Sequence, residues 1–198
     1  MSSVSDELST RDRLLDAAIE AATIHGIAKL SVGDVAKRAN LSRQTLYKHF
    51  ASKDEIVAHA VLREATTMVG RIVEASDAET DTRAAIEAGI LTTLSLTREH
   101  PLLDRLIRTE PEALLPLMIG DTGSVAMAVR SVVDGIVARR LPHLSDVERR
   151  RAADLLARLL VSYAVNAPDD PPEVVASFIA TVLTTGLEER VPLARTRR

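Results

Sequence analysis

The feature that most constrains this chain is a pair of helix-start signals within residues 31–50, SVGDVAKRANLSRQTLYKHF. Ser31 and Ser42 each have an apolar residue just before them and another at the fourth helical position, the hydrophobic-staple arrangement. Ser31 followed by Asp34 also fits a capping box. The link between the helices is only about three residues, and Asn40 there tolerates the left-handed conformation that ends a helix. Two helices at such a turn form a helix-turn-helix, whose second helix enters the DNA major groove.

Positive charge is concentrated around the same stretch. Six basic residues and one acidic residue lie between residues 29 and 53, so this segment carries +5 while the whole chain carries −3. Charge alone leaves a solvated helix face without a partner as an equal alternative. The second helix favours DNA, because it offers hydrogen-bonding side chains within two turns while Leu46 and Phe50 point inward. These side chains are Arg43, Gln44, Thr45, Tyr47, Lys48 and His49.

The segment resembles the N-terminal domain of the tetracycline-repressor family of bacterial transcription regulators. The family's best-known run is S-x-x-T-[LI]-Y-x-[HY]-F followed by x-[SN]-K-[ED]-x-[LI]. It is matched by Ser42, Thr45, Leu46, Tyr47, His49, Phe50, Ser52, Lys53, Asp54 and Ile56. Where the family places its first two helices, the matching residues are Leu14, Ala17, Ala18, Ala21, Gly26, Ser31, Val35, Ala36 and Ala39. Gln44 departs from the small residue usual in the family, which bears on DNA sequence preference rather than on the fold.

The resemblance assigns roles to the second helix. It implies that Tyr47 and Lys48 contact phosphates and that Thr45 packs near a base or a phosphate. Arg43 and Gln44 would read bases, because Arg–guanine and Gln–adenine are the pairs available to them. The helix starts can also present backbone N–H groups to phosphates, which adds the two capping serines. The residues expected to contact DNA are Ser31, Ser42, Arg43, Gln44, Thr45, Tyr47, Lys48, His49 and Lys53.

Composition limits the class of protein. A hydrophobic content of 46% excludes a disordered chain, and the absence of Cys excludes disulfides and thiolate metal sites. No apolar run reaches the length of a membrane span, and the N-terminus MSSVSDELSTRD is polar rather than a signal peptide. We therefore expect a cytoplasmic, nucleoid-associated protein with no membrane partner.

Apolar spacing and cap signals predict an all-α chain of about nine helices. The expected segments are residues 10–25, two short helices within 31–50, then 52–75, 82–99, 102–109, a short turn at 112–118, 124–140, 145–166 and 172–189. Polar residues 76–81 are expected to break the chain after the fourth helix. Strand signals are almost absent, because the β-branched residues recur at helical spacing rather than in alternation.

The fourth helix sets the expected domain boundary. Ser52 and Glu55 make a capping box, so this helix begins straight after the DNA-reading unit with no flexible linker. Residues 1–51 are predicted to form the helix-turn-helix domain, and residues 52–198 a helical domain for ligand binding and dimerisation. At 1.5 Å per residue the fourth helix would span roughly 36 Å, which suits a lever between the two domains.

The last two helices predict a homodimer. They are apolar most of the way round, whereas a surface helix shows a single apolar stripe. A second subunit would cover the extra side in a four-helix bundle with two-fold symmetry; a central helix of a monomeric bundle is the alternative. Members of the resembled family also dimerise through their last two long helices. The expected interface residues are Leu155, Leu159, Val175, Phe178, Ile179 and Val182.

The resemblance further implies a small inducer among the middle helices. Only four aromatic residues occur, so a pocket has little to stack flat or cationic drugs. An aliphatic lining instead suits a lipophilic effector such as an acyl chain, a terpenoid or a sterol-like compound. Each candidate residue fits plain core as well as a pocket. The candidates are Leu62, Leu94, Leu106, Met118, Val133, Leu160 and Tyr163.

Enzyme signatures are missing from the sequence. It has no Cys nucleophile, H-E-x-x-H, Gly-rich phosphate loop or G-x-S-x-G, and its five His show no ligand spacing. No catalytic residue, metal or cofactor is therefore expected. The sequence predicts a one-component repressor that binds a near-palindromic double-stranded DNA operator as a dimer and is released by the effector. Two alternatives stay open: a ligand-independent regulator controlled by a protein partner, and a helical interaction module with a vestigial helix-turn-helix.

Overall fold

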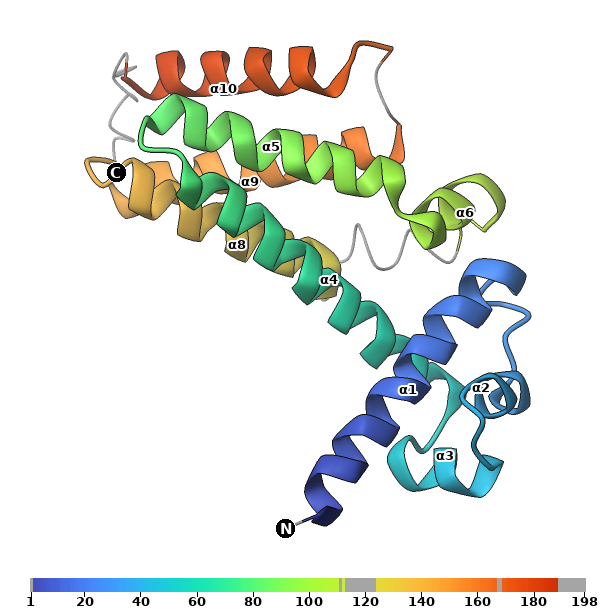
Figure 1. Cartoon of the computed structure of the whole chain (residues 1–198). Coiled ribbons are helices and arrows are strands. Elements are labelled where there is room, and N and C mark those ends of the chain that lie inside the picture. The colour runs from blue at the N-terminus through green and yellow to red at the C-terminus, as the bar shows by residue number, and fades with distance from the viewer. Residues whose placement is uncertain (1, 111, 113–123, 167–168, 189–198) are drawn as a thin grey trace, which may run out of the picture. The chain divides into compact units, whose positions relative to one another are not determined.

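The protein is described by a computed structural model that covers residues 2–110, 112, 124–166 and 169–188 (Figure 1). Every regular element within these ranges is an α-helix, so the all-α prediction is confirmed. The helices are α1 (Ser2–His25), α2 (Val32–Arg38), α3 (Arg43–His49), α4 (Lys53–Ala78), α5 (Thr82–Glu99), α6 (Pro101–Thr109), α8 (Ser124–Arg140), α9 (Asp146–Val165) and α10 (Pro172–Glu188). None of these helices combines the length and apolar composition needed to cross a bilayer.

Contacts divide the chain into two compact units. Unit 1 comprises Met1–Thr67 and Glu99–Met127, and unit 2 comprises Met68–Arg98 and Ala128–Arg198. Helix α4 contributes its first part to unit 1 and its last part to unit 2. Helix α6 belongs to unit 1, although it lies far along the chain from α1–α3. The sequence placed α6 in the C-terminal domain and did not predict this grouping.

The core of unit 1 joins α1, α2, α3, the start of α4 and α6. Leu14 and Leu15 of α1 meet Leu46 of α3 there, and Phe50 closes the end of α3. Its members from α6 and α4 are Leu102, Leu106, Ile56 and Ala60. Because these side chains leave water almost completely, burial fixes α1, α2 and α3 against one another. Caps at Ser31 and Ser42 further fix the starts of α2 and α3.

The core of unit 2 joins α5, α8, α9 and α10. One face of each helix contributes aliphatic side chains, and alanines on α9 and α10 allow close helix approach. Its largest members are Ile86, Ile90, Leu94, Val133, Val137, Leu141, Leu156, Leu160, Val175, Ile179 and Leu183. Ser145 and Glu148 form the predicted capping box at the start of α9, with Ser145 N donating to Glu148 Oε2 over 2.8 Å.

Three predicted boundaries were wrong. Helix α1 begins at Ser2 rather than at residue 10, and no Gly or Pro interrupts the chain before Gly26. Helix α4 continues through the expected break, because Ser76 is fully buried and its carbonyl accepts a 2.5 Å hydrogen bond from Arg140 Nη2. Helix α6 begins at Pro101, whose fixed φ suits a first helical position. The short turn predicted at 112–118 lies outside the described residues except for Glu112.

Candidate DNA-binding surface and effector cavity

The start of α2 is fixed by Ser31. Its Oγ accepts a hydrogen bond from Asp34 N over 3.1 Å and donates to Asp34 Oδ2 over 2.5 Å. The carboxylate thus reaches the serine hydroxyl, whereas the predicted capping box has it reach the backbone N–H. The side-chain hydrogen bond from Ser31 lowers the pKa of Asp34, and His25 and Arg43 lower it further against an opposing effect of desolvation.

The turn between α2 and α3 follows the predicted left-handed path. Asn40 has φ 54°, and its N–H donates to Lys37 O over 3.1 Å. Leu41 N donates to Ala36 O over 2.8 Å, which completes a Schellman ending for α2. Ser42 then caps α3 by accepting from Thr45 N over 3.0 Å. These bonds fix the angle at which α3 leaves α2.

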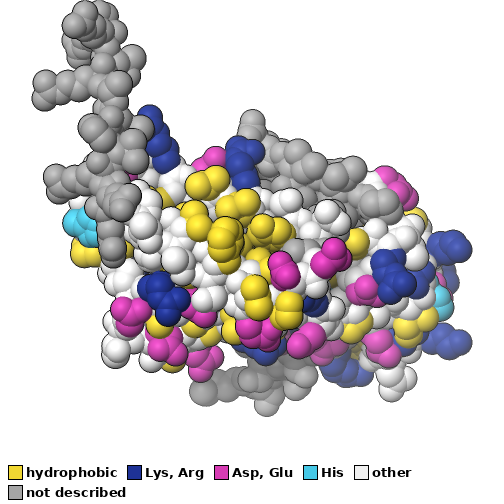
Figure 2. All heavy atoms as spheres, turned by 90° about the horizontal axis from the view of Figure 1, so that it is seen from above, with side chains coloured by type: hydrophobic (Ala, Val, Ile, Leu, Met, Phe, Trp, Pro, Cys, Tyr) yellow, Lys and Arg dark blue, Asp and Glu magenta, His cyan; other side chains and the backbone are white. Residues whose placement is uncertain are grey.

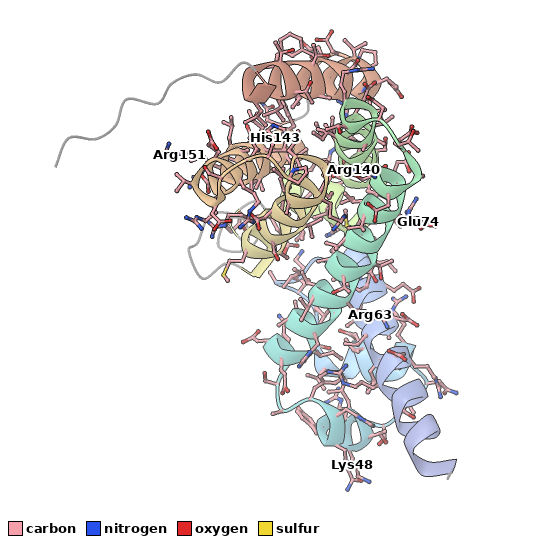
Figure 3. All side chains as sticks on the ribbon, turned by 90° about the vertical axis from the view of Figure 1, so that its left-hand side faces the viewer. Lys48, Arg63, Glu74, Arg140, His143 and Arg151 are labelled. Atoms are coloured by element: carbon pink, nitrogen blue, oxygen red, sulfur yellow. The ribbon has the colours of Figure 1, made fainter. Side chains whose placement is uncertain are left out.

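Helix α3 is amphipathic in the sense that DNA reading requires. Leu46 and Phe50 are buried at 0% and 1% exposure, whereas Tyr47 is 55% exposed. Figure 3 shows Lys48 projecting from α3 into solvent. Of the remaining predicted contact residues, Ser31, Ser42, Arg43 and Gln44 are exposed, and Thr45, His49 and Lys53 are half-buried. One face of α3 therefore anchors the helix, and the opposite face presents its polar side chains outward.

The sequence missed the role of Gly33 in α2. A Cβ at this position would lie 2.8 Å from Cζ of Arg43, so the missing side chain makes room for the guanidinium of α3. A shallow open groove runs beside this contact. Its lining residues are Gly33, Ala36, Lys37, Asn40, Leu41, Ser42 and Arg43. No sequence signal could have found this contact, because it depends on how two helices pack.

Two of the predicted cations have partners inside unit 1. Lys53 Nζ donates to Ala28 O over 3.0 Å, and Arg38 Nη1 pairs with Glu20 Oε1 at 2.7 Å. Lys29, Lys37 and Lys48 remain exposed. Lys53 therefore holds the loop at Ala28 within unit 1, in addition to the DNA contact that the sequence predicts for it.

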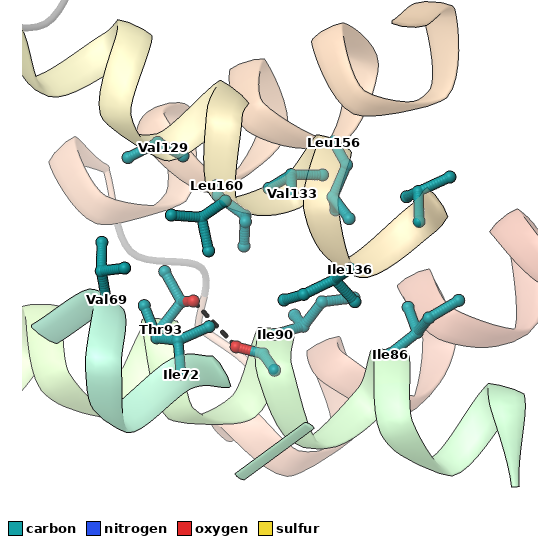
Figure 4. A pocket seen from close by; sticks show the side chains of 13 residues that line it. Val69, Ile72, Ile86, Ile90, Thr93, Val129, Val133, Ile136, Leu156 and Leu160 are labelled. Atoms are coloured by element: carbon teal, nitrogen blue, oxygen red, sulfur yellow. Dashed lines mark hydrogen bonds between the residues drawn. The ribbon is translucent and has the colours of Figure 1, made fainter. Parts of the chain in front are cut away.

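Unit 2 contains a small apolar cavity of about 50 Å³ among α4, α5, α8 and α9 (Figure 4). The residues that line it are Val69, Ile72, Ile86, Gly89, Ile90, Thr93, Val129, Val132, Val133, Ile136, Val137, Leu156 and Leu160. Thr93 is the single residue with a polar side chain in this lining, and its Oγ1 donates to Gly89 O over 2.8 Å. The cavity therefore presents aliphatic surface and no charged group.

The predicted effector residues divide between several locations. Val133 and Leu160 line the cavity. Leu94 and Tyr163 belong to the surrounding core of unit 2 without appearing in the lining. Leu62 and Leu106 belong to unit 1, where the first is 50% exposed and the second is buried in the core. Neither of these two residues lines the cavity of unit 2, and their contact with an effector stays a prediction. Met118 lies outside the described residues.

Some of the predicted interface residues are buried in the single chain and others are exposed. Val175 and Ile179 are buried in the core of unit 2, so they offer little surface to a second subunit. Leu159 is half-buried. Leu155, Phe178 and Val182 are 53%, 70% and 54% exposed. Val174, which the predicted interface did not include, is 54% exposed on α10 with Phe178 and Val182. Figure 2 shows hydrophobic side chains gathered on the outer face that α10 forms. An apolar patch therefore remains uncovered in the single chain.

A helix-turn-helix whose second helix turns its polar face outward defines the class as DNA-binding transcription regulators. A family profile described as bacterial regulatory proteins, tetR family, matches residues 14–60. A second profile, described as the C-terminal domain of the bacterial tetracycline repressor, matches residues 81–185. The chain belongs to the TetR family, which confirms the resemblance drawn from its sequence.

Individual relatives are regulators rather than enzymes. The crystal structure of the TetR family repressor AlkX from a Dietzia strain, implicated in n-alkane biodegradation, aligns with a TM-score of 0.68 and 25% identity over 90% of this chain and 95% of that one. The regulator Rv1255c of Mycobacterium tuberculosis is 27% identical over 87% of this chain and 85% of its own length. The transcriptional activator FasR of Mycolicibacterium smegmatis is 27% identical, over 65% and 67% of the two lengths.

Proposed function

We propose that this protein is a ligand-responsive repressor that binds a near-palindromic operator as a homodimer and is released by a small lipophilic effector. The observation that carries the proposal is the outward polar face of α3, held in place by the burial of Leu46 and Phe50. Arg43 and Gln44 would read base edges there, and Lys48 would neutralise a phosphate. We place the protein in the cytoplasm, on the nucleoid, because its partner would be chromosomal DNA.

The dimer follows from the apolar patch on α9 and α10. Exposed Leu155, Val174, Phe178 and Val182 form a surface that a second copy of the chain would cover with the same residues. A symmetric dimer carries two copies of α3, which would enter major grooves one DNA turn or more apart. We propose residues 1–51 as the DNA-binding domain and residues 52–198 as the domain for the effector and the dimer contact.

The cavity of unit 2 supports a lipophilic effector. Its lining is aliphatic and the hydroxyl of Thr93 is already engaged, so a charged group would be buried there without a partner. The similarity to an AlkX repressor implicated in n-alkane degradation supports a hydrocarbon-like ligand. Helix α4 lines the cavity through Val69 and Ile72 and begins straight after α3, so an effector that displaces α4 would act on the DNA-reading unit.

One observation favours a second candidate function, a regulator controlled by a protein partner. A cavity of about 50 Å³ is well below the roughly 300–1,000 Å³ of pockets that enclose drug-sized ligands. An effector would therefore have to part the helices, whereas a regulator controlled by a protein partner would need no pocket. Adding decane, 1-decanol or decanoate to the protein–DNA complex separates the two candidates. Release by any of these supports an effector, and the absence of release by all three favours the protein partner.

The primary test is a gel shift at physiological salt with the DNA upstream of the protein's own gene and competitor DNA. The Tyr47→Ala/Lys48→Ala double variant is the control, because both side chains are exposed and their loss leaves the core intact. We expect a specific shift that the double variant loses. If neither this DNA nor DNA selected from random sequence is bound, the proposed function is wrong and the helical interaction module is favoured.

A further inference from the structure

Glu110 is the one charged side chain among the buried residues of the described ranges, at 9% exposure. It follows the last turn of α6, where its N–H donates to Leu106 O over 3.0 Å and ends the helix. Burying a carboxylate is costly unless hydrogen bonds compensate for the lost water. The hydrogen-bonding groups around Glu110 therefore indicate which part of the fold its carboxylate stabilises.

The carboxylate of Glu110 holds the loop that follows α1. Its Oε2 accepts a hydrogen bond from Ala28 N over 3.1 Å. A Cβ at residue 26 would lie 2.6 Å from Cδ of Glu110, so the carboxylate occupies the space that Gly26 leaves open. Gly26 has φ +84°, which independently favours glycine. Gly26, which ends α1, thus also leaves room for the side chain of Glu110, 84 positions further along the chain.

The same loop is held from its other side. Ala28 O accepts from Lys53 Nζ over 3.0 Å, so both hydrogen-bonding groups of Ala28 are engaged by charged side chains. Leu30, two residues on, is buried at 3%, and Ser31 then caps α2. Since the loop leads directly into that cap, its conformation determines where α2 begins and hence where α3 lies.

Helix α6 is attached to unit 1 along its whole length. His100 Nε2 lies 3.4 Å from Glu64 Oε2 of α4 at its start, and Leu102 and Leu106 enter the core of unit 1 in its middle. Glu110 completes the attachment at its end. A single residue, His100, separates α6 from α5, and α5 lines the cavity of unit 2.

We propose that Glu110 is a positioning residue for DNA binding, which acts by fixing the loop at residues 26–30 through Ala28. It touches no DNA in this role. Losing the carboxylate leaves the Ala28 N–H without its partner and frees the loop, so α2 and α3 no longer have a single placement. The predicted loss of DNA affinity rests on the DNA-binding function proposed above. The predicted change in the loop at residues 26–30 does not depend on that function.

The test compares three variants of the full chain. Glu110→Ala removes the acceptor, Glu110→Gln keeps an acceptor for Ala28 N–H, and Glu112→Ala is the matched control, because Glu112 is exposed two positions away. Hydrogen exchange at residues 26–30 is measured without DNA. The dissociation constant and its salt dependence are measured on DNA selected by the wild-type protein.

We expect Glu110→Ala to speed exchange at residues 26–30 and to raise the dissociation constant about tenfold, the loss typical of one hydrogen bond to a charged group. The salt slope should stay unchanged, because no phosphate contact is lost. Glu110→Gln and Glu112→Ala should stay close to the wild type in all measurements.

The proposal is overturned if Glu110→Ala alters thermal stability while loop exchange and affinity remain those of the wild type. It is also overturned if Glu112→Ala has the same effect, or if Glu110→Gln fails to restore both readouts. If Glu110→Ala does not fold, Glu110→Gln with normal exchange and tenfold weaker binding contradicts the proposal as well. If the wild type selects no DNA, the proposed function fails, and unchanged loop exchange in Glu110→Ala would still refute the role of Glu110.

Discussion

At the scale of single residues, the DNA contacts proposed for α3 divide into side chains that read bases and a side chain that neutralises a phosphate. Arg43 and Lys48 are both exposed cations on one short helix, but only Arg43 has the fork geometry that pairs with two acceptors of guanine. We predict that Arg43→Ala loosens sequence preference. Lys48→Ala should weaken all sites alike and lower the slope of log affinity against log salt by about one. Binding to a panel of single-base operator variants at several salt concentrations measures both effects.

The two substitutions control for each other, since each removes one exposed positive charge. A Lys48→Ala protein with altered base preference and an unchanged salt slope would contradict these assignments. The guanidinium of Arg43 lies over Gly33 of α2, so Arg43→Ala also removes this contact between the two helices.

Asp34 gives the start of α2 a dependence on pH. Its pKa is lowered from 3.8, chiefly by the hydrogen bond from Ser31. A carboxyl group whose folded pKa is depressed stabilises the fold above its unfolded pKa, and this contribution is lost as pH falls through the folded value. We predict that Asp34→Asn is less stable than the wild type at pH 7, and that the difference shrinks below pH 3.8. Urea unfolding at pH 7 and pH 3 measures the difference in unfolding free energy between the wild type and Asp34→Asn. A difference that grows at low pH would refute the prediction.

At the scale of the helices, the sequence predicts the helix caps but not which helices pack against one another. The serines that start α2, α3 and α9 all cap as the sequence indicates, because a cap involves residues only three positions apart. The cavity lining comes from four helices, so periodicity identified Val133 and Leu160 as apolar without separating them from Leu106, which is core in unit 1. The attachment of α6 to unit 1 gave no sequence signal, because an apolar face does not indicate its partner.

The cavity is testable through the glycines of α4 and α5. A Cβ at Gly89 would meet Ser76 Cβ, Ile136 Cδ1 and Ile72 Cγ2 at 3.8–3.9 Å, which is ordinary contact, whereas a Cβ at Gly70 meets nothing within 4 Å. Both glycines lie inside helices, so Gly89→Ala and Gly70→Ala should each stabilise the fold by roughly 0.5–1 kcal/mol. Only Gly89→Ala should reduce the release of DNA by 1-decanol, because its added methyl group narrows the cavity.

Thermal unfolding and a decanol titration of the protein–DNA complex measure the two effects. Gly70→Ala is the control for helix propensity, since its stability gain comes without any change in the cavity. Equal decanol responses of the two variants would place the effector elsewhere than in this cavity.

At the scale of the whole molecule, the proposed function requires a second copy of the chain. A near-palindromic operator needs two copies of α3, and α9 and α10 leave Leu155, Val174, Phe178 and Val182 exposed. A surface of this kind on an isolated chain favours association, because its burial removes apolar area from water. Under the proposed function, DNA reading and dimerisation are coupled, since each half-site contributes only part of the affinity.

Phe178→Glu tests this coupling. Phe178 is 70% exposed, so a charge there leaves the core of unit 2 intact but would be buried without a partner in the dimer. We predict a folded monomer by light scattering and a large loss of operator affinity, with circular dichroism unchanged. Met127→Glu is the matched control, because Met127 is also exposed, at 50%, but lies on α8 outside the patch. A Phe178→Glu protein that remains a dimer would place the subunit contact elsewhere, and a monomer with full operator affinity would break the link between dimerisation and DNA reading.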